Sequence, residues 1–140
     1  MGADERGCLL INAHFLSDTP IVTNDLVITE GDDRFKWLGR ADHIVNSGGI
    51  KLIPEPLEAE MGQMIPRPFF LAGMTDPVLG EKLVLVVEGT PDPDLLEVIR
   101  ESKELDTYEI PKELIFMPEF SRTETGKINR GETLKILGKN

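Results

Sequence analysis

The first part of the chain alternates short apolar runs with polar residues. Apolar runs occupy residues 8–11, 21–22 and 26–28, and an alternating segment follows at 34–38. Runs of this length between polar residues predict β-strands, two or three of them before residue 30. So few strands are only marginally stable alone, and their edges and apolar faces lack partners within this chain. We therefore expect this segment to fray or to self-associate by pairing with another copy.

A hairpin is predicted at the start of the second part. The apolar segments 44–45 and 50–53 flank Ser47, Gly48 and Gly49. A Gly-Gly pair between two short strand-forming segments favours a two-residue hairpin turn.

Two helices are predicted from apolar spacing. Pro54 is expected to begin the first, because proline is tolerated in the first helical turn. Its buried stripe should consist of Leu57, Met61 and Met64. The second helix follows Asp92–Asp94, and its predicted inward side chains are Leu95, Val98, Ile99 and Leu105.

Three further strands are predicted at 69–72, 82–88 and 114–117. The segment 82–88 is almost continuously apolar, so we place it in the centre of the sheet, covered on both faces. Asn129 and Glu132 have the spacing of a capping box, which predicts a short last helix with Leu134 and Leu137 inward. The predicted fold class is α+β, a small central β-sheet with flanking helices, preceded by the few strands of the first part.

Composition limits the classes of protein that remain. The chain has 140 residues, 40% of them hydrophobic, and a net charge of −10, which fits one globular core. Residues 1–110 carry 9 basic against 21 acidic side chains, and residues 111–140 carry 6 against 4. An acidic body argues against nucleic acid as a partner. No apolar run approaches the ~20 residues of a membrane helix, and the start lacks a secretory signal, so we expect no membrane partner and a cytoplasmic location.

Cysteine and histidine add little chemistry. A single cysteine, Cys8, excludes an internal disulfide, and its apolar neighbours indicate a buried hydrophobic role. His14 and His43 are isolated in the sequence, and no cluster has metal-ligand spacing. We therefore predict no metal site within the chain.

The segment 121–130, Ser-Arg-Thr-Glu-Thr-Gly-Lys-Ile-Asn-Arg, is the most informative motif. Gly126 permits a turn that residues with a Cβ resist. Lys127 directly after it can project as a mobile point charge toward a phosphate or carboxylate. The alternative from this segment alone is a polar hairpin tip with a solvated lysine.

A second motif narrows this choice. Residues 39–58, Gly-Arg-Ala-Asp-His through Pro-Leu-Glu, resemble the signature that opens the small C-terminal domain of adenylate-forming enzymes, the acyl-CoA synthetase superfamily. Residues 121–130 resemble the closing signature of that domain. Upstream, 23–27 resembles the last nucleotide-binding motif of the large N-terminal domain, with Asn24 where glycine is usual. The amino-acid sequences of segments 23–27 and 35–40 most resemble those of o-succinylbenzoate–CoA ligases of menaquinone biosynthesis.

The resemblance implies a domain division and a set of site residues. Residues 1–38 would be the incomplete end of the N-terminal adenylation domain, and 39–140 the mobile C-terminal lid domain. Lys127 would be the catalytic lysine of adenylation. Asp25 and Arg40 would contact the nucleotide ribose.

The resemblance also implies movement. Asp42 would be the hinge on which the small domain rotates between two half-reactions. The hairpin with Gly48 and Gly49 would then replace the lysine and let the backbone approach the CoA thiol arm.

The implied substrates are ATP, CoA and a small-molecule acid. Mg2+ would be bound mainly by the absent N-terminal adenylation domain. That domain would also be the main protein partner of this chain. The chain alone is expected to make neither adenylate nor thioester. Two alternatives stay open: a stand-alone non-catalytic module that kept the lid fold, and the same ligase chemistry on a fatty or aryl acid.

Overall fold

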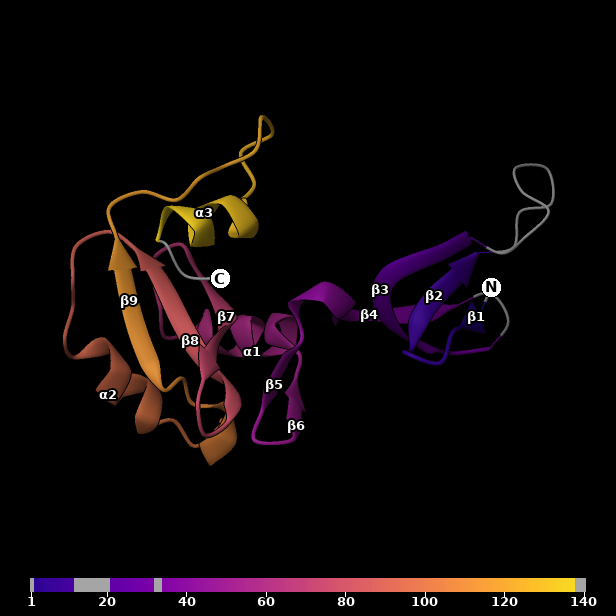
Figure 1. The fold of residues 1–140 in the computed structure, drawn as a ribbon, viewed down its shortest axis with the longest axis horizontal. Helices are drawn as coiled ribbons and strands as arrows, with labels where there is room; N and C mark the ends of the chain where they lie inside the picture. Colours follow the sequence, from indigo (N-terminus) through magenta and orange to yellow (C-terminus); the bar gives the residue numbers. More distant parts are fainter. Residues whose placement is uncertain (1, 12–20, 32–33, 138–140) are drawn as a thin grey trace. The chain divides into compact units, whose positions relative to one another are not determined.

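A computed structural model describes residues 2–11, 21–31 and 34–137. The chain divides into two compact units, residues 1–44 and 45–140, and each is described separately (Figure 1). His14 and the part of the segment expected to fray that spans 12–20 lie outside the described residues. No helix among the residues described is both long and apolar enough to cross a membrane.

The first unit is a four-stranded antiparallel sheet with the order β1-β2-β3-β4. Its elements are β1 (Gly2–Ala3), β2 (Cys8–Ile11), β3 (Ile21–Thr29), β4 (Phe35–Arg40) and a 3₁₀ turn, η1 (Ala41–His43). The apolar runs 21–22 and 26–28 lie on one strand, β3, rather than on two. Cys8 is buried, as predicted, together with Leu9, Leu26 and Val27.

Large apolar side chains remain on the surface of this unit. Val22, Ile28 and Trp37 are 59%, 53% and 50% exposed. Exposed apolar side chains of this size are typical of a surface that packs against another part of a protein. Fraying of this segment or its pairing with a second copy remains a prediction.

The second unit is a five-stranded sheet with helices on both faces. Its strands are β5 (Val45–Ser47), β6 (Ile50–Leu52), β7 (Phe69–Asp76), β8 (Gly80–Glu88) and β9 (Glu113–Met117). Its helices are α1 (Pro54–Met61), α2 (Leu95–Arg100), η2 (Thr107–Glu109) and α3 (Arg130–Ile136). β8 is central: it pairs antiparallel with β7, parallel with β9, and antiparallel with β5 at Ser47–Gly80.

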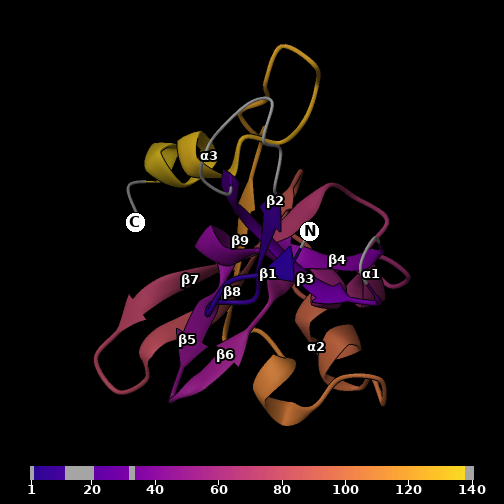
Figure 2. The ribbon, with the colours of Figure 1, turned by 90° about the vertical axis from the view of Figure 1, so that its right-hand side faces the viewer.

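The side chains of β8 alternate between two cores. Leu83, Leu85 and Val87 pack with α1 and α2, whereas Val84 and Val86 pack on the face that α3 covers. Figures 1 and 2 show α2 near the start of β9, and α3 with its preceding loop near the end of β9. The predicted central strand covered on both faces is confirmed, and so is the α+β class.

Helix ends differ from the prediction at two places. α1 ends at Met61, before Gly62, a poor helix former; Met64 follows in a turn and is partly buried against the same core. α2 ends at Arg100, so Leu105 reaches the core from the following loop. Val98, predicted inward, is 46% exposed, because Leu95 and Ile99 alone form the buried face of this short helix.

The last helix is capped as predicted. The Asn129 side chain accepts a hydrogen bond of 3.1 Å from the backbone N–H of Glu132. Leu134 and Leu137 are partly buried on the α3 face of the sheet, and Thr133 is the fully buried residue of the helix.

The neighbouring residues Val98 and Ile99 provide a matched stability test. Ile99 is fully buried, so Ile99→Ala should lower the free energy of unfolding by about 2–5 kcal/mol. Val98→Ala removes an exposed side chain and should change it by less than about 0.5 kcal/mol. Urea denaturation of both variants measures the difference, and equal losses would show that the assigned face of α2 is wrong.

Candidate functional site

Lys127 lies on a hydrogen-bonded hairpin loop, residues 121–129, here called the lysine loop. Arg122 and Ile128 form an antiparallel bridge at its base. Nearer the tip, the N–H of Thr123 donates to the carbonyl of Lys127 at 2.8 Å, and the N–H of Gly126 donates to the carbonyl of Thr123 at 2.9 Å. Gly126 has φ 86°, a conformation that favours glycine. The backbone of the lysine is thus fixed by the turn.

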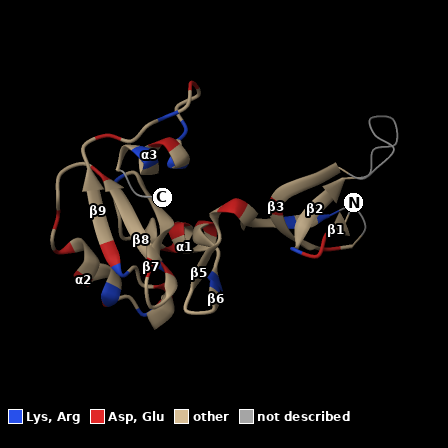
Figure 3. Ribbon diagram, viewed as in Figure 1, with Lys and Arg blue, Asp and Glu red and all other residues tan. Residues whose placement is uncertain are grey.

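The Lys127 side chain is exposed. Within residues 2–11, 21–31 and 34–137 its ammonium group makes no hydrogen bond or ion pair. Figure 3 shows basic positions on the arms of this loop and in α3. An unpaired ammonium on a fixed turn can bind an external anion without first breaking an internal ion pair.

Glu88, the last residue of β8, holds the start of the lysine loop. Its carboxylate accepts hydrogen bonds from both terminal nitrogens of Arg122, at 2.7 and 3.2 Å. It also accepts the backbone N–H of Phe120 at 2.7 Å. These donors, Arg122 first, lower the pKa of Glu88 below its ordinary value.

Glu58, on α1, holds the end of the lysine loop. Its two carboxylate oxygens accept hydrogen bonds from Arg130 at 2.7 and 2.6 Å. One of them also accepts the backbone N–H of Leu71 in β7 at 2.8 Å. The Arg130 guanidinium lies over the Phe70 ring, 5.5 Å from its centroid.

Thr133 ties the two ends of the lysine loop together. Its buried hydroxyl accepts the N–H of Ser121 at 3.1 Å and donates to the carbonyl of Asn129 at 2.7 Å. The N–H of Asn129 donates to the carbonyl of Ser121 at 2.8 Å. The loop therefore closes on itself at its base.

The predicted hairpin with Gly48 and Gly49 is present between β5 and β6. Both glycines have positive φ, 58° and 85°, as in the two-residue turns that suit hairpins. The N–H of Gly48 donates to the carbonyl of Leu79 at 2.9 Å. A Cβ at Gly48 would lie 3.2 Å from a Leu79 methyl group, whereas nothing lies within 4 Å of one at Gly49. The space beside Gly49 is thus open.

Asp25 and Arg40 lie opposite each other in the first unit. They form a cross-strand pair of β3 and β4, with 3.9 Å between the Arg40 Nη1 and the Asp25 Oδ1. The Trp37 indole N–H donates to the same Asp25 oxygen at 3.3 Å. Both members of the pair are partly exposed, so a polar ligand can reach them.

Asp42, the predicted hinge, is bonded to Arg40. The Arg40 Nε and Nη2 donate to the two Asp42 carboxylate oxygens at 3.1 and 3.4 Å. The hydrogen bond from Arg40 is the main cause that lowers the pKa of Asp42. Asp42 lies in η1, which ends one residue before the last residue of the first unit.

The structure thus groups some predicted residues and separates others. Asp25, Arg40 and Asp42 meet around one guanidinium in the first unit. In the second unit, the glycine hairpin and the lysine loop are separate elements.

Sequence reasoning missed Trp37, Glu58 and Glu88. The two glutamates bind arginines 72 and 34 residues away in sequence, and no local pattern indicates such pairs. For Trp37 the two-residue period gave no signal, because Trp37 and Arg40 are three residues apart and only the register shift between β3 and β4 lets both reach Asp25.

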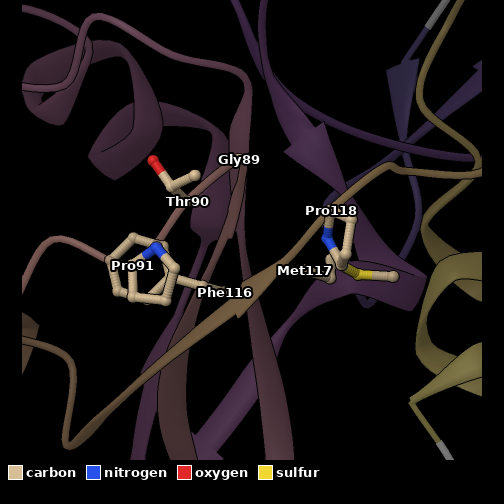
Figure 4. A pocket seen from close by; sticks show the side chains of 6 residues that line it. All are labelled: Gly89, Thr90, Pro91, Phe116, Met117 and Pro118. Carbon is tan, nitrogen blue, oxygen red and sulfur yellow. The ribbon is translucent and has the colours of Figure 1, made fainter.

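A pocket lies beside the ends of β8 and β9 (Figure 4). Its volume is about 450 Å3, and it is lined by Gly89, Thr90, Pro91, Phe116, Met117 and Pro118. Figure 4 shows Pro91 and Phe116 on one side and Met117 and Pro118 on the other. None of these residues is titratable, and none was predicted as a site residue.

Curated relatives were found by sequence, although no family model matches the chain. A probable 2-succinylbenzoate–CoA ligase of Mycobacterium tuberculosis is 31% identical over 121 residues, covering 81% of this chain and 31% of that protein. A medium/long-chain-fatty-acid–CoA/3-oxocholest-4-en-26-oate–CoA ligase of the same species is 32% identical over 112 residues, covering 76% and 20%. The chain therefore spans less than a third of the length of these relatives.

Solved structures give the same family. An AMP-forming acyl-CoA synthetase/AMP-acid ligase II-like protein from Dyadobacter fermentans is 37% identical, with a TM-score of 0.66, covering 97% of this chain and 41% of that one. The o-succinylbenzoate CoA synthetase of Bacillus subtilis, in complex with its acyl-adenylate intermediate, has a TM-score of 0.68 over 83% of this chain and 24% of its own. At 20% identity, the second likeness concerns the fold alone.

The predicted resemblance is thereby confirmed: the homologues and structural neighbours of this chain are AMP-forming acyl-CoA synthetases, and the chain aligns with a portion of them.

Proposed function

We propose that this chain is the C-terminal portion of an acid–CoA ligase, in which residues 39–140 form a mobile lid and Lys127 is the catalytic residue of adenylate formation. The observation that carries the proposal is the unpaired ammonium of Lys127 on a fixed turn, in a chain whose homologues are acid–CoA ligases. Residues 1–38 are then the end of the large domain that supplies the rest of the active site.

The first half-reaction joins two anions. A carboxylate oxygen of the acid attacks the α-phosphorus of ATP, and the bond to pyrophosphate breaks. An ammonium between the carboxylate and the α-phosphate offsets their repulsion most when charge shifts in the transition state. Lys127 takes this role, while Asp25 accepts hydrogen bonds from the ribose hydroxyls and Arg40 reaches the same ribose.

The second half-reaction needs a different element at the same place. The CoA sulfur attacks the carbonyl carbon of the acyl-adenylate, and AMP leaves. Rotation about Asp42 removes the lysine loop and brings in the turn at Gly48 and Gly49. A short 3₁₀ turn beside the boundary of two compact units suits a hinge, because few residues there must change φ and ψ.

The acid is proposed to be o-succinylbenzoate, because the sequences of residues 23–27 and 35–40 resemble those of o-succinylbenzoate–CoA ligases. A second candidate is another acid, because a fatty-acid ligase is equally similar and a sulfoacetate–CoA ligase of Cupriavidus necator is 29% identical. ATP and CoA are the other substrates, and a cytoplasmic location suits them. The described residues bring no three His, Cys, Asp or Glu side chains together as a metal site. By the resemblance, Mg2+ would be bound mainly by the remainder of the ligase, and we expect the chain alone to be inactive.

A chimera tests the role of Lys127. This chain would replace the matching portion of the M. tuberculosis 2-succinylbenzoate–CoA ligase, and the two half-reactions would be assayed separately. Lys127→Ala should slow pyrophosphate release by a factor on the order of 10² to 10³, as for other preorganised electrostatic contacts. Thioester formation from supplied acyl-adenylate should change little. Equal slowing of both steps would make Lys127 a structural or uniformly binding residue and would contradict the proposal.

Asp42→Pro in the same chimera tests the hinge. Proline fixes φ and should hinder the rotation, so thioester formation should slow while pyrophosphate release is retained. Asp42→Ala is the matched control, because it also removes the ion pair with Arg40 but leaves φ free. If Asp42→Ala slows thioester formation as much as Asp42→Pro does, the loss comes from the missing carboxylate and not from restricted φ, which would contradict the hinge role.

A further inference from the structure

The lysine loop is held at both ends by the same arrangement of groups. At its start Arg122 binds Glu88 through two nitrogens, and at its end Arg130 binds Glu58 in the same way. Two parallel N–H donors on one carboxylate fix orientation as well as distance. Lys127 lies between the two pairs, five residues after one arginine and three before the other.

The glutamates of both pairs are largely shielded from solvent. The side chains of Glu58 and Glu88 are 15% and 17% exposed, whereas Glu97, which pairs with Arg100 on α2, is 63% exposed. An exposed pair of that kind contributes little to a fixed geometry. The two pairs that flank the lysine loop are therefore of a different class from the surface pair.

Each glutamate is in turn fixed by the backbone. Glu58 accepts the N–H of Leu71 on the outer edge of β7, and Glu88 stands at the end of β8 and accepts the N–H of Phe120. Each carboxylate thus fixes its arginine relative to the central sheet.

Hydrogen bonds across the lysine loop couple the position of its tip to the position of its base. Hydrogen bonds across the loop join Asn129 to Ser121 and Thr123 to Lys127. A shift of either arginine therefore moves the lysine rather than being absorbed within the loop. Catalysis is sensitive to such shifts, since misplacement by about 1 Å can cost on the order of 10²-fold in rate.

We propose that Glu58 and Glu88 are positioning residues for adenylate formation, which hold Lys127 in place through Arg130 and Arg122. This rests on the function proposed above for Lys127. Neither glutamate touches the substrates; each acts through its arginine and the lysine loop.

Glu58→Gln is the principal variant, because the amide keeps the size of the side chain and an acceptor for Leu71 but loses the second acceptor for Arg130. In the ligase chimera it should slow pyrophosphate release by about 10- to 100-fold. Acyl transfer from supplied adenylate should match that of Glu97→Gln, the control that neutralises an exposed glutamate. Behaviour like the control in both steps, or equal slowing of both steps, would overturn the proposal.

The pair Glu58 and Arg130 gives a second readout. If the glutamate acts through the arginine, Arg130→Gln alone should slow pyrophosphate release about as much as Glu58→Gln does, and the double variant Glu58→Gln/Arg130→Gln should be no slower than the slower single variant. Multiplied losses in the double variant, or a loss from Arg130→Gln with none from Glu58→Gln, would show that Arg130 acts on the substrates directly and would overturn the positioning role.

Hydrogen exchange on the 140-residue chain tests positioning without any ligase activity. Glu58→Gln should raise exchange at the amides of Gly126 and Asn129 and leave the β8 amides unchanged, relative to Glu97→Gln. Unchanged exchange in the loop would overturn the proposal even with an active chimera. A wild-type chimera that releases no pyrophosphate would instead contradict the proposed function, while the exchange result would still decide whether Glu58 holds the loop.

Discussion

Burial of β8 on both faces is the constraint on which the second unit depends. Residues 83–87 are all at most 1% exposed, and a strand with no polar face requires cover on each side. α1 and α2 supply one layer and α3 supplies the other. β8 ends at Glu88, the first polar position after this run, and that carboxylate binds the start of the lysine loop. The strand that organises the core thus also sets where the lysine loop begins.

The functional elements of this unit lie on turns that the sheet and its helices hold. The glycine hairpin is tied through Gly48 to the turn between β7 and β8. The lysine loop is tied through its two arginines to Glu58 and Glu88. Such an arrangement suits the exchange of two elements proposed above, because each element is held in its own shape by the sheet.

Local patterns in the sequence were sufficient for several elements. The Gly48–Gly49 turn, the central strand and the Asn129 cap follow from backbone preferences and apolar runs within a few residues. The end of α2 could not be predicted, because Leu105 is buried from a loop and its apolar character does not reveal that the helix has already ended. The pairing of Glu58 with a residue 72 positions away could not be predicted either, since α1 and the start of α3 pack on opposite faces of the sheet and only the complete fold brings Glu58 and Arg130 within reach.

Chemical replacement of the Lys127 ammonium tests whether its positive charge promotes adenylate formation. In the ligase chimera, Lys127→Cys can be alkylated to give either a positively charged aminoethyl side chain or a neutral carboxamidomethyl one. Cys8 of this chain is fully buried and protected, and the wild-type chimera treated alike controls for other cysteines. Only the charged side chain should restore pyrophosphate release, and acyl transfer from supplied adenylate should be equal in both products. Equal restoration by the neutral side chain, or restoration by neither, would contradict this role of the charge.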